Sequence, residues 1–162
     1  MSFLQKLWKK NEIKDGDIVS PVTGTIIATK DIADSVFAQE IMGQTIGIVP
    51  EEGIVVCPVN GKVEVLFPTG HAFGIKGNDG NSYLVHIGIE TVNLQGKGFT
   101  TWIKQGQNVK AGQKAVDVDL QYVKSNGLDT TVMLIVTEKK DDCNIQYVEK
   151  SNVIKAEKIN QG

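Results

Sequence analysis

Residues 68–91 read PTGHAFGIKGNDGNSYLVHIGIET and contain both histidines of the chain, His71 and His86. Two apolar stretches flank the turn sequence Gly-Asn-Asp-Gly within this segment. Such a pattern is typical of a β-hairpin, because Asn, Asp and Gly favour the tight turns that join antiparallel strands. The segment therefore predicts a β-rich fold and raises the question of whether its two histidines form one site.

The length of the hairpin loop decides how the histidines meet. A two-residue loop at Asn78 and Asp79 would place His71 directly opposite His86, with Cβ atoms about 4.5–5.5 Å apart on one face. A bulge at Gly80 would instead slip the register by one residue and loosen the pair. A close pair could bind a metal, perform acid–base chemistry, or combine a nucleophile with a charge-stabilising partner. The alternative is two unrelated, hydrogen-bonded histidines, and the spacing alone leaves both open.

The remainder of the chain reads as short strands rich in β-branched residues, separated by turns. Strands are predicted over residues 23–29, 44–49, 54–58, 62–67, 72–76, 82–88, 100–104, 114–119, 130–137 and 144–149, with helical turns only within 31–42 and 120–125. The segments SPVTGTI (20–26) and CPVNGKV (57–63) form a weak internal repeat. We therefore expect an all-β fold, an antiparallel β-sandwich or barrel-sandwich hybrid, with internal duplication.

The two ends of the chain differ from its middle. The sequence MSFLQKLWKK at residues 1–10 places apolar residues at helical spacing among lysines. This pattern predicts a short amphipathic helix that lies on an anionic membrane surface, and the alternatives are a frayed terminus or a helix that packs on its own domain. We expect an N-terminal amphipathic segment and linker at 1–17, one folded domain at 18–150, and a polar C-terminal tail at 151–162. The start at Met1 predicts a free-standing protein.

Composition excludes several classes of function. The formal net charge is -2, and all seventeen basic residues are lysine. Without arginine or a basic field, a nucleic-acid partner is not expected. Cys57 and Cys143 do not form a CxxC pair, so we predict two reduced thiols in or near the core. Reduced thiols, the lack of a signal peptide and the lack of a long apolar run together predict a cytoplasmic protein.

Longer motifs resemble one known family. PTGHAFGI followed by LVHIGIETVNLQGKGF is similar to the paired-histidine signature of the glucose-type enzyme IIA of the bacterial sugar phosphotransferase system. DSVFAQEIMG (34–43) and SPVTGTI match the same family, and the resemblance covers residues 18–137. It implies a phosphotransferase component with a phosphohistidine intermediate. Such a carrier accepts phosphate from the phosphocarrier protein HPr and passes it to the IIB domain of a glucose-family permease. Because that permease is membrane-bound, contact with the inner face of the membrane through residues 1–10 is also expected.

The resemblance also implies roles for individual residues. His86 would take the phosphoryl group on Nε2, His71 would assist the transfer, and the Thr69 hydroxyl would support His71. Residues expected beside the site, where partners dock, are Asp34, Val36, Phe37, Phe67, Phe73 and Glu90. The family usually has Asp where Glu90 stands, so this carboxylate reaches one methylene further.

Elementary chemistry agrees with a histidine carrier. A neutral imidazole is a competent nucleophile near pH 7. Because it attacks through the nitrogen that bears the lone pair, its other nitrogen must be protonated and held, typically by a backbone carbonyl. Gly88 lies just downstream of His86, but the sequence does not identify which carbonyl serves. No cofactor is required for such a transfer.

Two other functions fit parts of the sequence. A regulatory or metal-binding β-module could use the His71/His86 pair, although zinc would need further ligands, such as a carboxylate from a partner. SPVTGTI and QGQNVKAGQKAVDVD also resemble the turns of biotin and lipoate carrier domains. Those domains present one lysine beside methionine or aspartate, and no Met-Lys-Met motif occurs here. That likeness therefore indicates a related architecture rather than a shared function.

Overall fold

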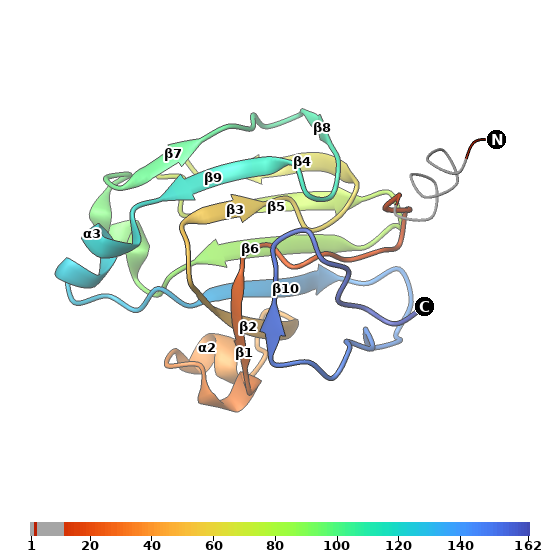
Figure 1. Cartoon of the computed structure of the whole chain (residues 1–162), viewed down its shortest axis with the longest axis horizontal. Coiled ribbons are helices and arrows are strands. Elements are labelled where there is room, and N and C mark those ends of the chain that lie inside the picture. Colours follow the sequence, from red (N-terminus) through yellow and green to blue (C-terminus); the bar gives the residue numbers. More distant parts are fainter. Residues whose placement is uncertain (1, 3–11) are drawn as a thin grey trace.

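Antiparallel pairing organises the chain into two sheets that face each other (Figure 1). The computed structural model describes residues 2 and 12–162. The larger sheet has eight strands in the order β11-β1-β2-β10-β6-β5-β4-β8, and the smaller one has the order β3-β9-β7. The strands are β1 (Gly24–Ile27), β2 (Gln44–Pro50), β3 (Ile54–Val56), β4 (Gly61–Leu66), β5 (Ala72–Gly77), β6 (Ser82–Ile87), β7 (Phe99–Thr101), β8 (Asn108–Val109), β9 (Lys114–Val118), β10 (Val132–Glu138) and β11 (Asn152–Val153). The predicted antiparallel β-sandwich is confirmed.

Helical structure is sparse and lies mostly near the ends of strands. Among the described residues the α-helices are α2 (Ser35–Ala38) and α3 (Leu120–Ser125), and the 3₁₀ turns are η1 (Thr29–Asp31) and η2 (Thr91–Leu94). An aspartate caps the N-terminus of each α-helix. The carboxylate of Asp34 or Asp119 accepts a hydrogen bond from a backbone N–H of the first turn. No helix among the described residues is long and apolar enough to cross a bilayer.

The internal duplication is visible in the larger sheet. Strands β1 and β4 lie second from opposite edges, β2 and β5 third, and β10 and β6 meet at the centre. The two repeat segments also bond each other reciprocally. Val19 N–H donates to Pro58 O and Val56 N–H donates to Pro21 O, both at 2.8 Å, and the two bonds join equivalent positions of the repeats. The Pro-Val-x-Gly likeness therefore marks a structural repeat.

The predicted strand at 144–149 is wrong. Within this stretch the backbone of Ile145 bonds the side-chain amide of Gln44 on both sides, at 2.8 Å each, and Tyr147 forms only an isolated bridge with Asn160. At Ile145 a side chain takes the place of a neighbouring strand, and the bridge at Tyr147 is too short to make one. Conversely, β8 and β11 were not predicted, because two residues are too few to show an alternating pattern.

Alternation along β6 separates two hydrophobic clusters. Tyr83, Val85 and Ile87 belong to the main core that the two sheets enclose. Leu84 points to the other face of the large sheet, where a smaller cluster includes Phe37 from α2. His86 shares this second face, because successive side chains of a strand point to opposite sides. The site histidine thus lies beside α2 rather than between the sheets.

The C-terminal residues do not form a separate tail. Ile159 is fully buried in the main core, and its N–H donates to Ile18 O at 2.8 Å. Strand β11 pairs with β1. The predicted boundary at residue 150 is therefore wrong, since later residues complete the fold. The predicted amphipathic helix at 1–10 lies outside the described residues, apart from Ser2.

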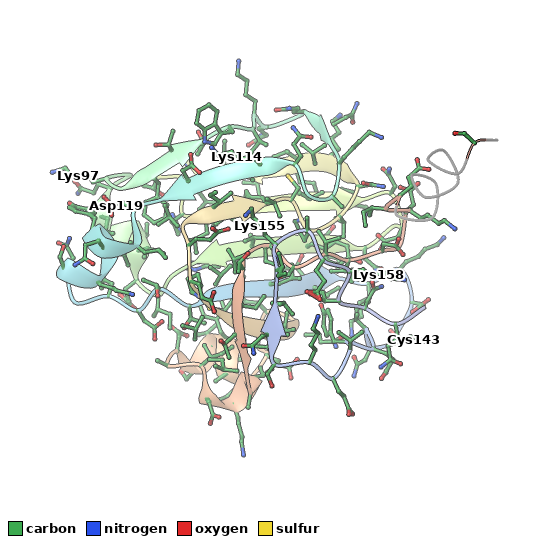
Figure 2. The ribbon with its side chains drawn as sticks, in the orientation of Figure 1. Lys97, Lys114, Asp119, Cys143, Lys155 and Lys158 are labelled. Atoms are coloured by element: carbon green, nitrogen blue, oxygen red, sulfur yellow. The ribbon has the colours of Figure 1, made fainter. Side chains whose placement is uncertain are left out.

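The predicted linker and the cysteines can be placed in part. Among the described linker residues, Asp15 Oδ1 accepts hydrogen bonds of 3.1 Å from the side-chain amides of Asn60 and Asn78. Cys57 is buried, as predicted, whereas Cys143 is exposed. Figure 2 shows Cys143 far from Lys97 and Asp119, which lie together beside α3.

Candidate active site: a histidine pair at one end of a hairpin

Strands β5 and β6 form the predicted hairpin, with a three-residue loop. Gly77 N–H donates to Asn81 O at 2.8 Å, and Gly80 has a φ of 94°. A third loop residue in the left-handed region is the usual form of such a loop. The register consequently pairs His86 with Ala72. The prediction that His71 lies directly opposite His86 is therefore wrong, and the alternative with a bulge at Gly80 is confirmed.

The imidazoles nevertheless meet. Their ring centroids lie 5.1 Å apart with an angle of 80° between the ring planes. His71 precedes β5 in a tight turn, in which Gly70 has a φ of 73° and its N–H donates to Phe67 O at 2.8 Å. His71 O in turn accepts from Ile87 N–H at 2.7 Å. The turn, rather than the strand register, brings the two rings together.

The protonation of His86 follows from one hydrogen bond. Its Nδ1 lies 2.8 Å from Gly88 O. A carbonyl oxygen only accepts, so Nδ1 carries the proton and the Nε2 of the neutral ring bears the lone pair. Within the described part of the chain, Nε2 has no hydrogen-bond partner. His86 is therefore arranged as a nucleophile at Nε2.

His71 is held by a different group. Its Nδ1 lies 2.5 Å from Thr69 Oγ1. A hydroxyl can donate or accept, so this contact is compatible with either tautomer of His71. If the hydroxyl donates to Nδ1, the Nε2 of His71 keeps its proton and can donate to an anionic oxygen. His86 would then offer a lone pair, and His71 a proton, to the same ligand.

Both rings are neutral at pH 7. Burial, assisted by the nearby His86, lowers the pKa of His71 to about 4. Burial also lowers the pKa of His86, while the Gly88 carbonyl and the Asp34 carboxylate act in the opposite direction. Neutrality is what a nucleophilic role of His86 requires, because a protonated imidazole has no lone pair with which to attack.

A shallow depression lies next to His86. It is lined by Asp34, Val36, Phe37, His86, Glu90 and Val92. The Phe37 ring packs 5.0 Å from the His86 ring, and the Phe67 ring lies edge-on at 5.3 Å from His71. Val36, Phe67 and Val92 are 39%, 37% and 50% exposed. We call these three residues, together with Phe37, the apolar rim.

Phe73 does not belong to this rim. It was expected at the docking surface, but it is fully buried in the main core. Its neighbour Ala72 pairs with His86, and adjacent residues of a strand point to opposite faces. The expectation was wrong because it ignored this alternation. Val92 is the rim residue that the sequence reading missed, although it lies two residues after Glu90.

The two carboxylates beside the site have different local structures. Asp34 is the N-terminal cap of α2, and its Oδ1 accepts from Val36 N–H at 2.8 Å. Glu90 has a left-handed backbone with a φ of 63°, and its Oε2 accepts from the Asn93 side chain at 3.3 Å. Among the described residues, no cluster of three or more histidine, cysteine or acidic side chains is arranged to hold a metal ion.

A protein-family comparison adds independent information. The family model for the phosphoenolpyruvate-dependent sugar phosphotransferase system, EIIA 1, matches residues 16–142. The chain belongs to this family. It is accordingly a phosphoryl carrier of the sugar phosphotransferase system, a phosphotransferase component whose acceptor is the IIB domain of a sugar permease.

Individual relatives agree with that assignment. A glucose-specific EIIA component of Staphylococcus epidermidis is 39% identical over 156 residues, covering 96% of this chain and 94% of the relative. A glucose-specific EIIA component of Staphylococcus aureus is 40% identical over 144 residues, covering 89% and 87%. A glucoside-specific EIICBA component of Staphylococcus carnosus is 39% identical over 142 residues, but these make up only 20% of that protein.

A solved structure has the same fold. The glucose permease IIA from Mycoplasma capricolum superimposes with a TM-score of 0.85 at 34% identity, covering 91% of this chain and 95% of the other. The EIIA sandwich is therefore common to both.

Proposed function

We propose that His86 is the residue that carries the phosphoryl group, taking it from phospho-HPr and passing it to the IIB domain of a glucose-family permease. The observation that supports this most directly is the hydrogen bond from His86 Nδ1–H to Gly88 O, which leaves the Nε2 lone pair free at the surface depression. The proposal that the permease belongs to the glucose family rests on the glucose-specific EIIA relatives.

The first step is a direct phosphoryl transfer from phospho-HPr to His86. The Nε2 lone pair of His86 attacks phosphorus as the bond between phosphorus and the donor atom breaks, and the electron pair of that bond returns to the donor atom. In the second transfer a nucleophile of the IIB domain attacks phosphorus, the Nε2–phosphorus bond breaks, and its electron pair returns to Nε2 of His86. Such transfers depend on positioning and charge stabilisation, and no cofactor is required here.

His71 and Thr69 support the transfer. With the Thr69 hydroxyl donating to Nδ1, the Nε2–H of His71 stabilises negative charge on the phosphoryl oxygens. His71 itself does not become phosphorylated. Because the ring is buried and neutral, it can donate a hydrogen bond without forming a stable ion pair that would retain the phosphoryl group.

The apolar rim provides the docking surface for both partners. Contact with a partner would cover Val36, Phe67 and Val92 and exclude water from the phosphoryl group, which slows its hydrolysis. Asp34 and Glu90 flank this surface with negative charge and favour a partner with basic residues around its active site. The exchange takes place on the cytoplasmic side, where residues 1–10 would lie on the membrane that holds the permease.

The test is phosphorylation from phosphoenolpyruvate with enzyme I and HPr, followed by mass spectrometry of the acid-labile phosphate. Wild type should take up one phosphoryl group, and His86→Ala should take up none. His71→Ala should accept the label and pass it poorly to a IIB domain. Cys143→Ser is the matched control, because Cys143 is exposed in the loop that contacts the opposite end of the hairpin.

Two outcomes would contradict the proposal. Failure of wild type to take up label from competent HPr would rule out the carrier role of His86. Label on His86→Ala but not on His71→Ala would reverse the two roles. The first result would favour a regulatory or metal-binding use of the pair, which zinc titration with and without the IIB domain would then examine. The second would make His71 the carrier and His86 its partner.

A further inference from the structure

The Gly88 carbonyl that holds the His86 proton belongs to a turn with an unusual backbone. Gly88 and Glu90 both lie in the left-handed region, with φ angles of 76° and 63°. A non-glycine residue such as Glu90 adopts this conformation only when its surroundings impose it. The direction of the Gly88 carbonyl is therefore set by contacts outside its own dipeptide.

Hydrogen bonds fix the peptide group between Ile87 and Gly88, the first plane of this turn, at both its carbonyl oxygen and its N–H. Thr91 Oγ1 donates to Ile87 O at 2.5 Å, and Gly88 N–H donates to Thr131 O at 2.9 Å. The Ile87 carbonyl and the Gly88 N–H belong to one planar peptide group. Fixing both atoms fixes the orientation of that plane.

The second plane is fixed in the same way. Ile89 N–H donates to Asp129 O at 3.0 Å, and Asp129 Oδ1 accepts from Thr131 N–H at 2.7 Å, which steadies this acceptor loop. In a planar trans peptide the carbonyl points away from the N–H. The Gly88 carbonyl is consequently directed away from Asp129 and toward His86 Nδ1.

Thr91 is the one side chain among the described residues that bonds either plane from outside the histidine pair. It is fully buried, so water does not replace its hydroxyl. Its methyl group also occupies the space beside Gly88, where an added Cβ would lie 2.5 Å from Thr91 Cγ2. Thr91 therefore restrains the turn through a hydrogen bond and through close packing.

We propose that Thr91 is a positioning residue for phosphoryl transfer: it holds the Gly88 carbonyl against His86 Nδ1 and so keeps the Nε2 lone pair available for attack. Its relevance to transfer rests on the proposed role of His86 as the nucleophile. Thr91 does not touch the phosphoryl group. It acts through the Gly88 carbonyl, which determines which nitrogen of His86 carries the proton and how the ring is oriented.

The first measurement is the tautomer of His86 in the unphosphorylated protein, read from the ¹⁵N chemical shifts of the imidazole at neutral pH. Wild type should be almost entirely the Nδ1–H form. Thr91→Val keeps the shape but loses the donor, and we expect the Nε2–H population to rise about fivefold, the size of one neutral hydrogen bond. Thr91→Ser keeps the hydroxyl and should restore the wild-type tautomer.

Thr45→Val is the matched control. Thr45 is 4% exposed, and its hydroxyl donates to Gly43 O at 2.9 Å, so the variant loses the same kind of buried bond away from the turn. Thr45→Val should lower the free energy of unfolding without changing the tautomer of His86. A shift in Thr91→Val no larger than in Thr45→Val, or no recovery in Thr91→Ser, would overturn the proposal.

The second measurement is the rate of phosphoryl uptake from phospho-HPr. Thr91→Val should be about threefold to tenfold slower than wild type, mainly because a less restrained Gly88 carbonyl no longer fixes the orientation of the His86 ring, with Thr91→Ser and Thr45→Val near wild type. If the tautomer shifts while wild-type His86 takes up no label, the proposed function fails and the role of Thr91 in placing the proton stands. If the tautomer shifts and wild type is labelled, but uptake by Thr91→Val is unchanged, Thr91 is not a positioning residue for transfer.

Discussion

The two ends of the β5–β6 hairpin are built alike but satisfy their polar groups differently. Each end has a tight turn with a left-handed glycine, Gly80 at one end and Gly88 at the other. At the Gly80 end the polar atoms pair with one another: Tyr83 Oη donates to Asp79 Oδ2 at 2.6 Å, and Asn81 N–H donates to Asp79 Oδ1 at 3.0 Å. At the other end, one nitrogen of each histidine is held and the other is left open.

This difference shows what distinguishes a reactive site from a structural polar cluster. A larger hollow lies near the Gly80 end, lined in part by Asp15, Asn60 and Asn78. Those side chains are already bonded to one another, so the hollow offers little unsatisfied chemistry. The smaller depression at the histidine end has an uncommitted lone pair at its edge. Here an open lone pair, and not the size of the hollow, indicates function.

Glycine substitutions should separate the two ends most strongly. In Gly88→Ala the new Cβ would lie 2.5 Å from Thr91 Cγ2 and 2.9 Å from Asp129 O, in addition to the left-handed strain. We expect a loss of about 4 kcal/mol in the free energy of unfolding, with severe loss of phosphoryl uptake. In Gly80→Ala the nearest atoms belong to the flexible Lys140 side chain, so about 1–2 kcal/mol is expected with normal uptake.

Urea denaturation and phosphoryl uptake, measured on both variants, check this contrast. Equal losses of stability, or a loss of uptake in Gly80→Ala, would show that the two ends are not functionally separate.

The pH dependence of stability should come from the histidine end. The pKa of His71 is about 4 in the folded protein and near its ordinary value of about 6.5 in the unfolded chain. Between these values the unfolded chain binds more protons, so acidification destabilises the folded state. The free energy of unfolding should be highest above pH 6.5 and fall by about 3 kcal/mol as the pH decreases to 4.

Denaturation curves at a series of pH values test this expectation. His71→Gln should flatten most of the slope, whereas Tyr83→Phe, at the other end, should retain it. A slope that survives in His71→Gln would assign the effect to other groups.

Removing one hydroxyl at each end should have opposite consequences. Thr69→Val removes the hydrogen bond to His71 Nδ1, and we expect transfer to the IIB domain to slow about fivefold with little change in stability. Tyr83→Phe removes the buried bond to Asp79 and should cost about 1–2 kcal/mol in stability with transfer unchanged. Parallel kinetic and denaturation measurements compare the two, and slowed transfer in Tyr83→Phe would contradict the separation.

The smallest effect concerns the carboxylates beside the site. Asp34→Asn removes the charge that raises the pKa of His86, while asparagine can still cap α2. The pKa of His86 should therefore fall slightly, and the change should diminish at high salt. Glu90→Gln is the matched control and should leave the pKa of His86 unchanged. An NMR titration of the His86 ring distinguishes the two variants.

The sequence predicted the sandwich and the hairpin, but it left open whether the histidines meet and which register the hairpin takes. Asn-Asp-Gly is compatible with a two-residue and a three-residue loop, and the φ of Gly80 decides between them. The error at Phe73 has a related origin, because side-chain direction depends on where each strand begins. The residue patterns that carried correct predictions were local ones, such as the turn and the strand alternation.

The part of the site that could not be predicted depends on contacts between residues that are distant in sequence. The carbonyl of Gly88 is oriented through Asp129 and Thr131, which lie on another strand connection. Nothing in LVHIGIET indicates those partners. The roles of His86 and His71 likewise came from the family resemblance, because their spacing alone left open two unrelated histidines.

The chain ends have a consequence for how such carriers are combined with other proteins. Glu12 and Gly162 line one hollow, and Glu12 also lines a hollow with Asn78 at the Gly80 end of the hairpin. At Glu12 and at Gly162 the chain therefore lies on the side opposite the phosphoryl site. This placement makes fusion and circular permutation compatible with partner exchange. It fits the observation that this chain matches nearly the whole length of an EIIA relative and about a fifth of an EIICBA relative.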